Sequence, residues 1–291
     1  MSSLRRLLES RAAHVAGTLL GLGLLGLLIA RLVDLWNEHP VPLEDSNWAL
    51  LVLGLAVSGI AMAGYGAVWP PTLRALGSEP PTGLLTAFFA GQLGKYLPGG
   101  AWQYVGRAGL AARLGVPLRT GVGSLAIEAS CSLVTAALVA SLTLATSPSG
   151  AAISAAILLA GLAALALLSR SALARRAVAD VGALRGATSR YLLDWIPFGV
   201  AFWLIANGLY DVPFSDLPLY AGVFALAWLA GFVVVFAPGG LGIREAVIVA
   251  LLRGRLGESE AIVLAAASRI AFTLVDLVGG AVALALLRRQ R

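Results

Sequence analysis

Predominantly apolar stretches of about twenty residues or more recur along this chain, and each is long enough to cross the hydrocarbon core of a bilayer as a helix. They cover residues 14–33, 47–69, 120–146, 150–168, 191–210 and 259–287, with only isolated charges inside them. Apolar residues make up 59% of the chain and charged residues 12%, against about 25% charged in a soluble domain. The sequence therefore predicts an all-α integral membrane protein, and it excludes a soluble enzyme, a nucleic-acid-binding protein and a secreted disulfide scaffold.

The first stretch needs a separate decision, because Arg5, Arg6 and Arg11 precede it as basic residues precede the core of a signal peptide. At about twenty residues it is long enough to span, and no A-x-A-like cleavage site follows it directly. We therefore expect residues 14–33 to be a retained first helix.

Two further apolar segments are interrupted near their centres by Pro-Gly-Gly. The breaks are Pro98, Gly99 and Gly100 in residues 84–115, and Pro238, Gly239 and Gly240 in residues 219–252. Proline removes a helical hydrogen bond, and the apolar arm before the first break is about 21 Å long at 1.5 Å per residue, too short to cross. Both segments are predicted to enter the membrane and return, as re-entrant hairpins.

Basic residues set the expected orientation. A cytoplasmic N-terminus places most of the 21 Lys and Arg residues inside, including Arg288, Arg289 and Arg291, and leaves the acidic loop 34–45 outside. The sequence thus predicts a multi-pass protein of the bacterial cytoplasmic membrane with both termini cytoplasmic. This orientation holds only if both broken segments return to the side from which they entered.

Aligning the two breaks reveals an internal repeat. Ala90-Gly91, six residues and Pro98-Gly99-Gly100 match Ala230-Gly231, six residues and Pro238-Gly239-Gly240. Residues 1–148 and 149–291 then each read as span, span, re-entrant hairpin, span, in opposite orientations. Inverted repeats whose broken helices meet at the midplane are a transporter architecture, although small residues and Pro-Gly pairs also recur by chance in membrane chains.

Candidate substrate-binding residues surround the first break. Lys95 is the only lysine of the chain and stands three residues before Pro98. Backbone amides freed at the break and a nearby ammonium group favour an anion. The residues assigned to this site are Lys95, Tyr96, Pro98, Gly99, Trp102 and Arg107. Anchoring at the membrane interface is an equal alternative for Trp102 and its neighbour Tyr104.

The second break supplies a matching set of candidates, which are Pro238, Gly239, Gly242, Arg244 and Glu245. Its glycines let the backbone turn sharply and approach a ligand. Glu245 also fits as a favourable charge at a helix N-terminus.

Further charges lie inside predicted spans, where an unpaired charge costs several kcal/mol. Glu128, Arg269 and Asp276 are assigned as intramembrane or coupling charges. A Glu128–Arg269 pair, either structural or transport-related, and a shared water-filled cavity are the alternatives. Asp194 is expected at the membrane interface, only a few residues into its helix.

Catalytic and metal-binding motifs are missing from the sequence. It contains no G-x-S-x-G, no H-E-x-x-H and no P-loop, and His14, His39 and Cys131 form no ligand cluster. We therefore expect no enzyme activity, no metal and no cofactor.

Two motifs together resemble the lysylphosphatidylglycerol synthase transmembrane family. The first reads Gly91-x-x-x-Lys95-Tyr96-Leu97-Pro98-Gly99 with Trp102 and Arg107, and the second reads Pro238-Gly239-Gly240-Leu241-Gly242-x-Arg244-Glu245. The resemblance implies the flippase region of that family, as a stand-alone member without the cytosolic synthase part. It therefore implies movement of a membrane lipid and leaves the lipid open, including lipid-linked sugars and other envelope lipids.

The sequence thus predicts a flippase- or scramblase-like transporter of a phospholipid or polyprenyl-linked lipid with a polar, phosphate-containing headgroup. Without an ATP-binding motif, uphill movement needs an ion gradient or a metabolic pull, and Glu128, Glu245 and Asp276 are the candidate proton carriers. The alternatives are a small-solute secondary transporter, an intramembrane lipid-phosphate enzyme and a membrane partner of a glycosyltransferase. A homodimer and a lipid-synthesising or glycosyltransferase partner are left open, and no nucleic-acid partner is expected.

Overall fold

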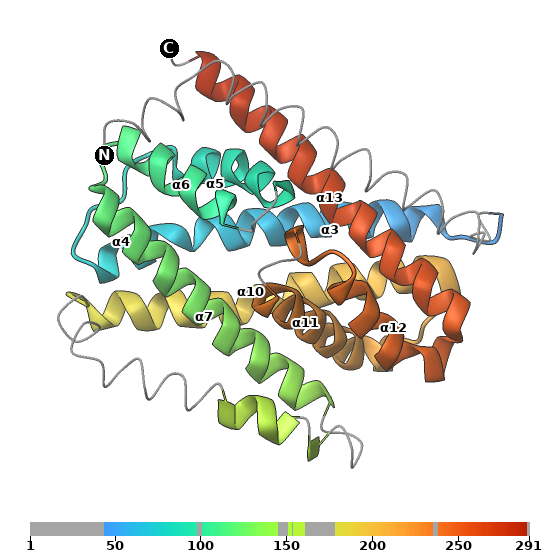
Figure 1. Cartoon of the computed structure of the whole chain (residues 1–291). Coiled ribbons are helices and arrows are strands. Elements are labelled where there is room, and N and C mark those ends of the chain that lie inside the picture. Colours follow the sequence, from blue (N-terminus) through green and yellow to red (C-terminus); the bar gives the residue numbers. More distant parts are fainter. Residues whose placement is uncertain are drawn as a thin grey trace.

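The computed structural model of the chain describes residues 44–97, 101–144, 151–152, 154–160, 178–234 and 238–289. Every element in these ranges is a helix, and no strand occurs among them (Figure 1). The predicted span 14–33 and the break residues Pro98 and Gly99 lie outside the described residues. The predicted span 150–168 is described only in part, as helical residues within 151–160.

The helices divide into long and short elements. The long ones are α3 (Trp48–Ala67), α7 (Leu118–Leu144), α10 (Val181–Tyr210), α11 (Leu217–Val233) and α13 (Glu258–Arg289). The short ones are α4 (Trp69–Ala75), α5 (Leu84–Gln92), η1 (Leu93–Tyr96), α6 (Trp102–Arg113), η2 (Phe214–Asp216), η3 (Pro238–Gly240) and α12 (Ile243–Leu256).

Five helical segments in the described part of the chain are long and apolar enough to cross a membrane. They are Trp48–Ala75, Leu118–Ser141, Val181–Tyr210, Phe214–Val233 and Glu258–Arg289. The prediction of an all-helical chain with membrane-length apolar helices is therefore confirmed for these residues. The fourth segment corresponds to the arm that precedes the break in the second predicted hairpin. This arm is therefore long enough to span the membrane by itself.

Side-chain caps fix where two of the long helices begin. The Asn47 side chain accepts a hydrogen bond from the Leu50 N–H at 3.3 Å before α3, and Asp180 accepts one from the Ala183 N–H at 3.0 Å before α10. Helix α10 thus begins ten residues before the predicted span 191–210. Hydrophobicity marks only the apolar part of a helix, whereas the cap at Asp180 marks where the backbone becomes helical.

Glycines let α3 and α10 pack with their backbones close together. A Cβ atom on Gly54 would lie 2.9 Å from Cγ1 of Ile205, and one on Gly208 would lie 2.9 Å from Cδ2 of Leu51. Real Cβ atoms do not approach other atoms so closely, and small residues are the usual means of close helix packing in membranes.

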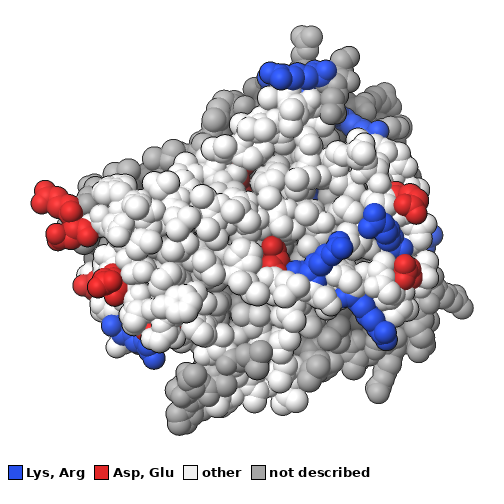
Figure 2. Space-filling model, turned by 180° about the vertical axis from the view of Figure 1, so that it is seen from behind, with Lys and Arg blue, Asp and Glu red and all other residues white. Residues whose placement is uncertain are grey.

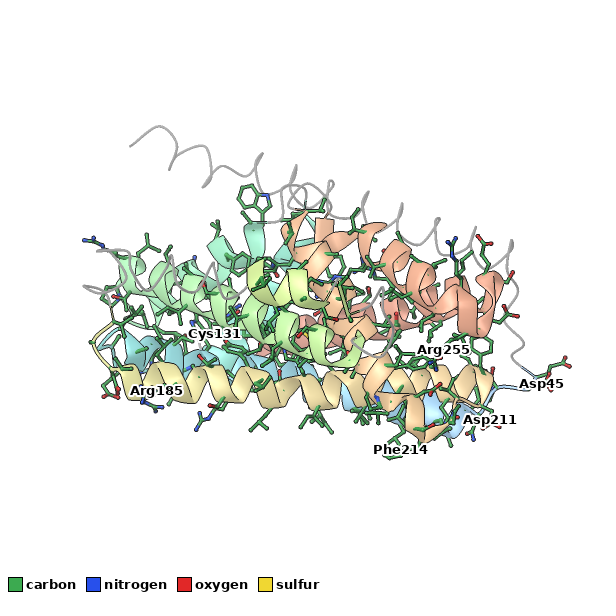
Figure 3. All side chains as sticks on the ribbon, turned by 90° about the horizontal axis from the view of Figure 1, so that it is seen from below. Asp45, Cys131, Arg185, Asp211, Phe214 and Arg255 are labelled. Atoms are coloured by element: carbon green, nitrogen blue, oxygen red, sulfur yellow. The ribbon has the colours of Figure 1, made fainter. Side chains whose placement is uncertain are left out.

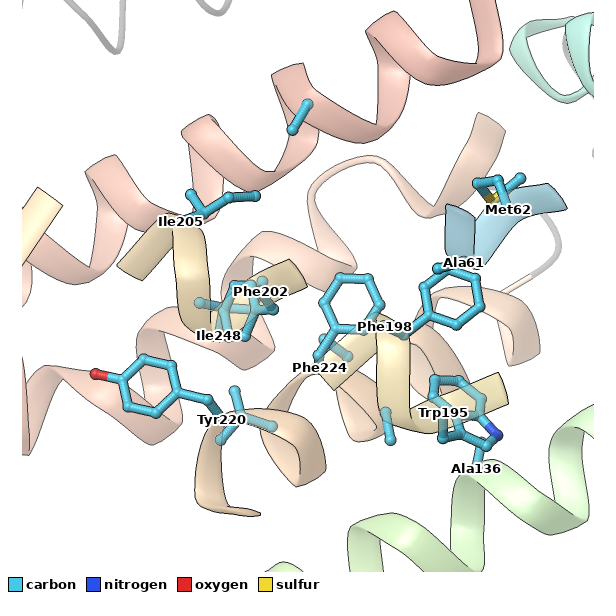
Figure 4. Close-up of a cluster of buried hydrophobic side chains, with 14 of the residues drawn as sticks. Ala61, Met62, Ala136, Trp195, Phe198, Phe202, Ile205, Tyr220, Phe224 and Ile248 are labelled. Carbon is cyan, nitrogen blue, oxygen red and sulfur yellow. The ribbon is translucent and has the colours of Figure 1, made fainter. Parts of the chain in front are cut away.

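An aromatic cluster joins three helices at the centre of the molecule (Figure 4). Trp195, Phe198 and Phe202 come from α10, Phe224 from α11 and Phe272 from α13. The rings of Phe224 and Phe272 stack with centroids 4.9 Å apart, and Phe198 lies 5.9 Å from Phe224. Phe198, Phe224 and Phe272 of this cluster also line the cavity described below.

Charged side chains leave much of the surface free. Most of the face in Figure 2 carries no Lys, Arg, Asp or Glu, and exposed apolar side chains such as Val52, Ile60 and Val278 are found on the long helices. Figure 3 places Asp45, Asp211 and Arg255 at one end of the helices and Arg185 at the other. An apolar belt between two charged ends is the surface that helices in lipid require.

The two broken segments meet beside α13. Helix α5 and η1 pack against α6, α11 packs against α12, and η1 contacts η3 directly. Helix α13 contacts α5, η1 and α12. The segments that carry the two Pro-Gly-Gly motifs, far apart in the sequence, are therefore neighbours in the structure.

Candidate functional site: a charged cavity between two broken helices

A cavity of about 260 Å³ lies between the two broken segments. Its lining contains both polar and aromatic residues. The polar residues are Gln92, Lys95, Gln103, Tyr104, Arg107, Glu128 and Arg244, and the aromatic ones include Phe198, Phe224, Trp228, Phe232 and Phe272. Gly239 and Gly240 of the second break also line it, so both motifs identified in the sequence contribute to one cavity.

Lys95 connects the first break to α13. Its ammonium group forms an ion pair with Asp276, whose side chain is 1% exposed. The Tyr96 hydroxyl donates a hydrogen bond to Oδ2 of the same carboxylate at 2.8 Å. Asp276 therefore holds two consecutive residues of η1 at once.

Arg107 connects the first return arm, α6, to the next long helix, α7. Both of its terminal nitrogens donate to the two carboxylate oxygens of Glu128, and the two side chains are 2% and 1% exposed. Its guanidinium group also lies 4.4 Å from the Trp69 ring and 4.8 Å from the Phe88 ring. Of the two alternatives for Glu128, the pair with Arg269 is not formed, because Glu128 pairs with Arg107 of its own half, whereas Glu128 does line the cavity.

Arg269 connects the second break to α13. Its Nε donates to Oε1 of Glu245 at 2.7 Å, and its Nη1 donates to the Gly239 carbonyl at 3.0 Å. The other oxygen of Glu245 accepts the Gly242 N–H at 2.7 Å. Gly242 has a φ of 81°, which a residue with a side chain rarely adopts, so this glycine is needed for the turn.

Arg244 differs from the other three cations around the cavity. Within the described residues it forms no ion pair, and its Nε, like that of Arg107, is buried without a hydrogen-bond partner. It faces the main cavity and also a smaller one of about 30 Å³, which Ser268 and Arg269 help to line. Its stem packs on Gly231, where an added Cβ atom would lie 2.6 Å from its Cγ.

The remaining assigned residues have different positions. Trp102, at the start of α6, is 44% exposed and is not among the residues that line the cavity. Pro238 begins η3, while Pro98 and Gly99 lie outside the described residues. Asp194 is buried near the middle of α10 and packs against Gly64, and its place at the membrane interface stays a prediction.

Sequence reasoning missed part of the cavity wall. Gln92 is 5% exposed and lines the cavity, and Trp69 and Phe88 stack on Arg107. A glutamine inside an apolar run, next to Gly91 of the first motif, was a usable signal. The two aromatic residues gave none, since aromatic residues are frequent in any apolar helix.

Among the residues that the structure describes, no three or more His, Cys, Asp and Glu side chains form a group that could hold a metal ion. The chain matches no protein-family model, and no curated protein matches it significantly. The site is therefore interpreted from its own residues.

Proposed function

We propose that this protein is a flippase- or scramblase-like transporter, which moves a lipid with a polar, phosphate-containing headgroup across the bacterial cytoplasmic membrane. The observation that carries this proposal is the cavity between the two breaks, which both cations and aromatic rings line. Irregular backbone at membrane depth is tolerated where it is buried in protein or lines a polar cavity. The headgroup would occupy the charged part, and the tails would remain in lipid.

The proposed topology has six spans and two re-entrant hairpins arranged as an inverted repeat. Three features support it. Each break lies between two packed helical arms and is followed by a long helix, α7 or α13. In both halves a glycine seven residues before the proline packs against an arginine of the return arm, Gly91 against Arg107 and Gly231 against Arg244. In both halves the return arm is also ion-paired to the next long helix, with the charges exchanged.

The resemblance to the lysylphosphatidylglycerol synthase transmembrane family supports the same proposal. The residues that carry it, Lys95 and Arg244 above all, face the cavity. We assign Lys95 and Arg244 to the headgroup phosphate and Arg107 to holding the wall of the cavity. Asp276, Glu128 and Glu245 are the carboxylates through which a proton gradient would act, and a lipid-synthesising or glycosyltransferase enzyme would supply the lipid.

The test is reconstitution of the purified protein in vesicles that carry fluorescent lipids, with loss of fluorescence after addition of an impermeant reductant as the readout. We expect the protein to speed up translocation, and Lys95→Gln to lower the rate about tenfold, the scale of one charge-assisted hydrogen bond. Arg185→Gln, at the exposed start of α10, is the matched control and should keep the wild-type rate.

The same vesicles separate the alternatives. Movement of an entrapped soluble solute without movement of lipid would favour a small-solute transporter. Chemical conversion of the labelled lipid would favour an intramembrane enzyme. Absence of lipid movement from every lipid tested, with the protein correctly inserted, would reject the proposed function.

A further inference from the structure

The two halves of the site differ at one point. In the first half, Arg107 directs both terminal nitrogens at the Glu128 carboxylate. In the second half, Arg244 also packs on a glycine of the arm that precedes the break, Gly231 of α11. No carboxylate pairs with Arg244 in the described part of the chain. Arg107 therefore has a carboxylate partner within the protein, whereas its counterpart Arg244 has none among the described residues.

Arg107 and Arg244 follow the two prolines by nine and six residues, so they correspond by their packing on a glycine and not by their count from the break. The residue that stands near Arg244 on the next long helix is Ser268. Glu128 follows Pro98 by 30 residues, and the residue that follows Pro238 by 30 is Ser268 of α13. The Ser268 side chain is 3% exposed, and it lines the small cavity together with Arg244. Glu245 also lines this small cavity, but its two oxygens accept from Arg269 and from the Gly242 N–H. Where the first half has a carboxylate paired with its arginine, the second half has the Ser268 hydroxyl and a carboxylate that is paired elsewhere.

The charges around the two cavities do not cancel. The cations are Lys95, Arg107, Arg244 and Arg269, and the carboxylates are Asp276, Glu128 and Glu245. Three cations are paired with these three carboxylates, so among the residues that the structure describes Arg244 is left with an uncompensated positive charge. Arg244 is half-buried, and a charge that is partly removed from water is stabilised by a counter-charge. One bound negative charge would complete the set.

We propose that Arg244 binds the phosphodiester of a lipid headgroup, which takes the position that the Glu128 carboxylate has beside Arg107, and that the site selects headgroups with one net negative charge. This inference rests on the proposed function and names the class of lipid. Two phosphodiester oxygens match the planar fork of an arginine as a carboxylate does. The amine of a zwitterionic headgroup would find the carboxylates around the cavity already paired, and a phosphomonoester would bring a second charge without a partner.

Binding can be measured apart from transport with water-soluble short-chain lipids and purified protein in detergent. Trp228 lines both cavities, so tryptophan fluorescence is a suitable signal. The probes are dihexanoyl phosphatidylglycerol, dihexanoyl phosphatidylcholine, dihexanoyl phosphatidic acid and inorganic phosphate. We expect the phosphatidylglycerol to bind about tenfold more tightly than each of the others, and Arg244→Gln to remove this preference. Arg253→Gln, exposed on the same helix, should bind as the wild type does.

The sharpest variant places an internal carboxylate where the lipid phosphate is proposed to lie. Ser268→Asp should occupy Arg244 and weaken binding of the phosphatidylglycerol about tenfold or more. Ser268→Asn has the same shape without the charge and should leave binding close to the wild-type value. A loss of binding common to both variants would be a packing effect, in which case Arg244→Gln and Arg244→Lys decide the question.

Wild-type affinity in Arg244→Gln would overturn the inference. Equal or tighter binding of phosphatidic acid or of inorganic phosphate would do so too, the latter by pointing to a free anion as the ligand. Translocation of all headgroups at one rate would reject this inference and leave the proposed function standing. Binding of phosphatidylglycerol without translocation of any lipid would reject the proposed function while the anion site remains.

Discussion

Most charged side chains around the cavity form ion pairs. Removing one member of a buried pair costs more stability than replacing both members with uncharged residues. Arg107 and Glu128 are almost completely buried, so removal of one leaves the other as a bare charge away from water. Removal of both leaves neither charge. A buried ion pair is for this reason weak evidence of stability but strong evidence of a fixed position.

For Arg107→Met we predict a loss of roughly 3–5 kcal/mol in the free energy of unfolding, because Glu128 then lacks a partner. The double variant Arg107→Met, Glu128→Gln should be more stable than the single one. Unfolding in a denaturing detergent, followed by tryptophan fluorescence, measures both. A double variant whose loss equals the sum of the two single losses would show that the pair is not coupled.

Charged residues of the site were identifiable from the sequence, whereas their partners were not. Lys95, Arg244 and Glu245 stand beside Pro-Gly-Gly breaks, and charges in apolar runs are rare enough to be noticed. The pairing depends on which helix faces which, and hydrophobicity carries no information on that. Glu128 and Arg269 follow their breaks by similar distances, 30 residues after Pro98 and 31 after Pro238, which made a pair conceivable, but each belongs with the return arm of its own half.

At the scale of elements, glycines decide how the broken segments lie against their neighbours. Gly239 has a φ of 59° inside η3, and a Cβ atom there would lie 3.7 Å from the Lys95 carbonyl. The second break is thus both strained for any other residue and in contact with the first. Longer side chains at this position would separate η1 from η3.

Gly239→Leu should therefore lower lipid translocation strongly and leave membrane insertion intact, since none of the long helices is altered. Gly254→Leu in α12 is the matched control, because nothing lies within 4 Å of the Cβ position there. The measurement is the translocation rate per inserted protein in vesicles. Equal rates for both variants would reduce the second break to a packing feature.

Elements were predictable to different extents. The predicted spans 47–69 and 259–287 lie on α3, α4 and α13, because long apolar runs leave little choice in lipid. The start of α10 was misplaced by ten residues, since Arg185 and Arg190 are as compatible with a helix as with a loop. The cap at Asp180 carried the correct signal, and a hydrophobicity pattern does not include it.

At the scale of the whole molecule, the number of times that the chain crosses the membrane can be tested by experiment. Helix α11 is long enough to span, whereas its return arm α12, at 14 residues or about 21 Å, is not. If α11 returns as a hairpin, the C-terminal end of α13 lies on the cytoplasmic side. If it crosses, that end lies outside.

Single cysteines in a Cys131→Ser background test this topology with an impermeant thiol reagent. Asp45→Cys and Asp216→Cys should react from outside in intact cells, and Arg185→Cys and Arg289→Cys only after permeabilisation. Arg185 lies at the opposite end of the helices from Asp45, so these two positions also test whether the bundle spans at all. External labelling at Arg289 would remove the second hairpin and the inverted repeat together.

The two attachments on α13 have a mechanical consequence. Arg269 holds the second break and Asp276 holds the first, and seven residues, about 10 Å along the axis, separate them on one side of the helix. A tilt of this rod about a point between them moves the two attachments in opposite directions. Such a tilt would move one break toward the axis of the molecule while it moves the other away. The two breaks would therefore move alternately and not together.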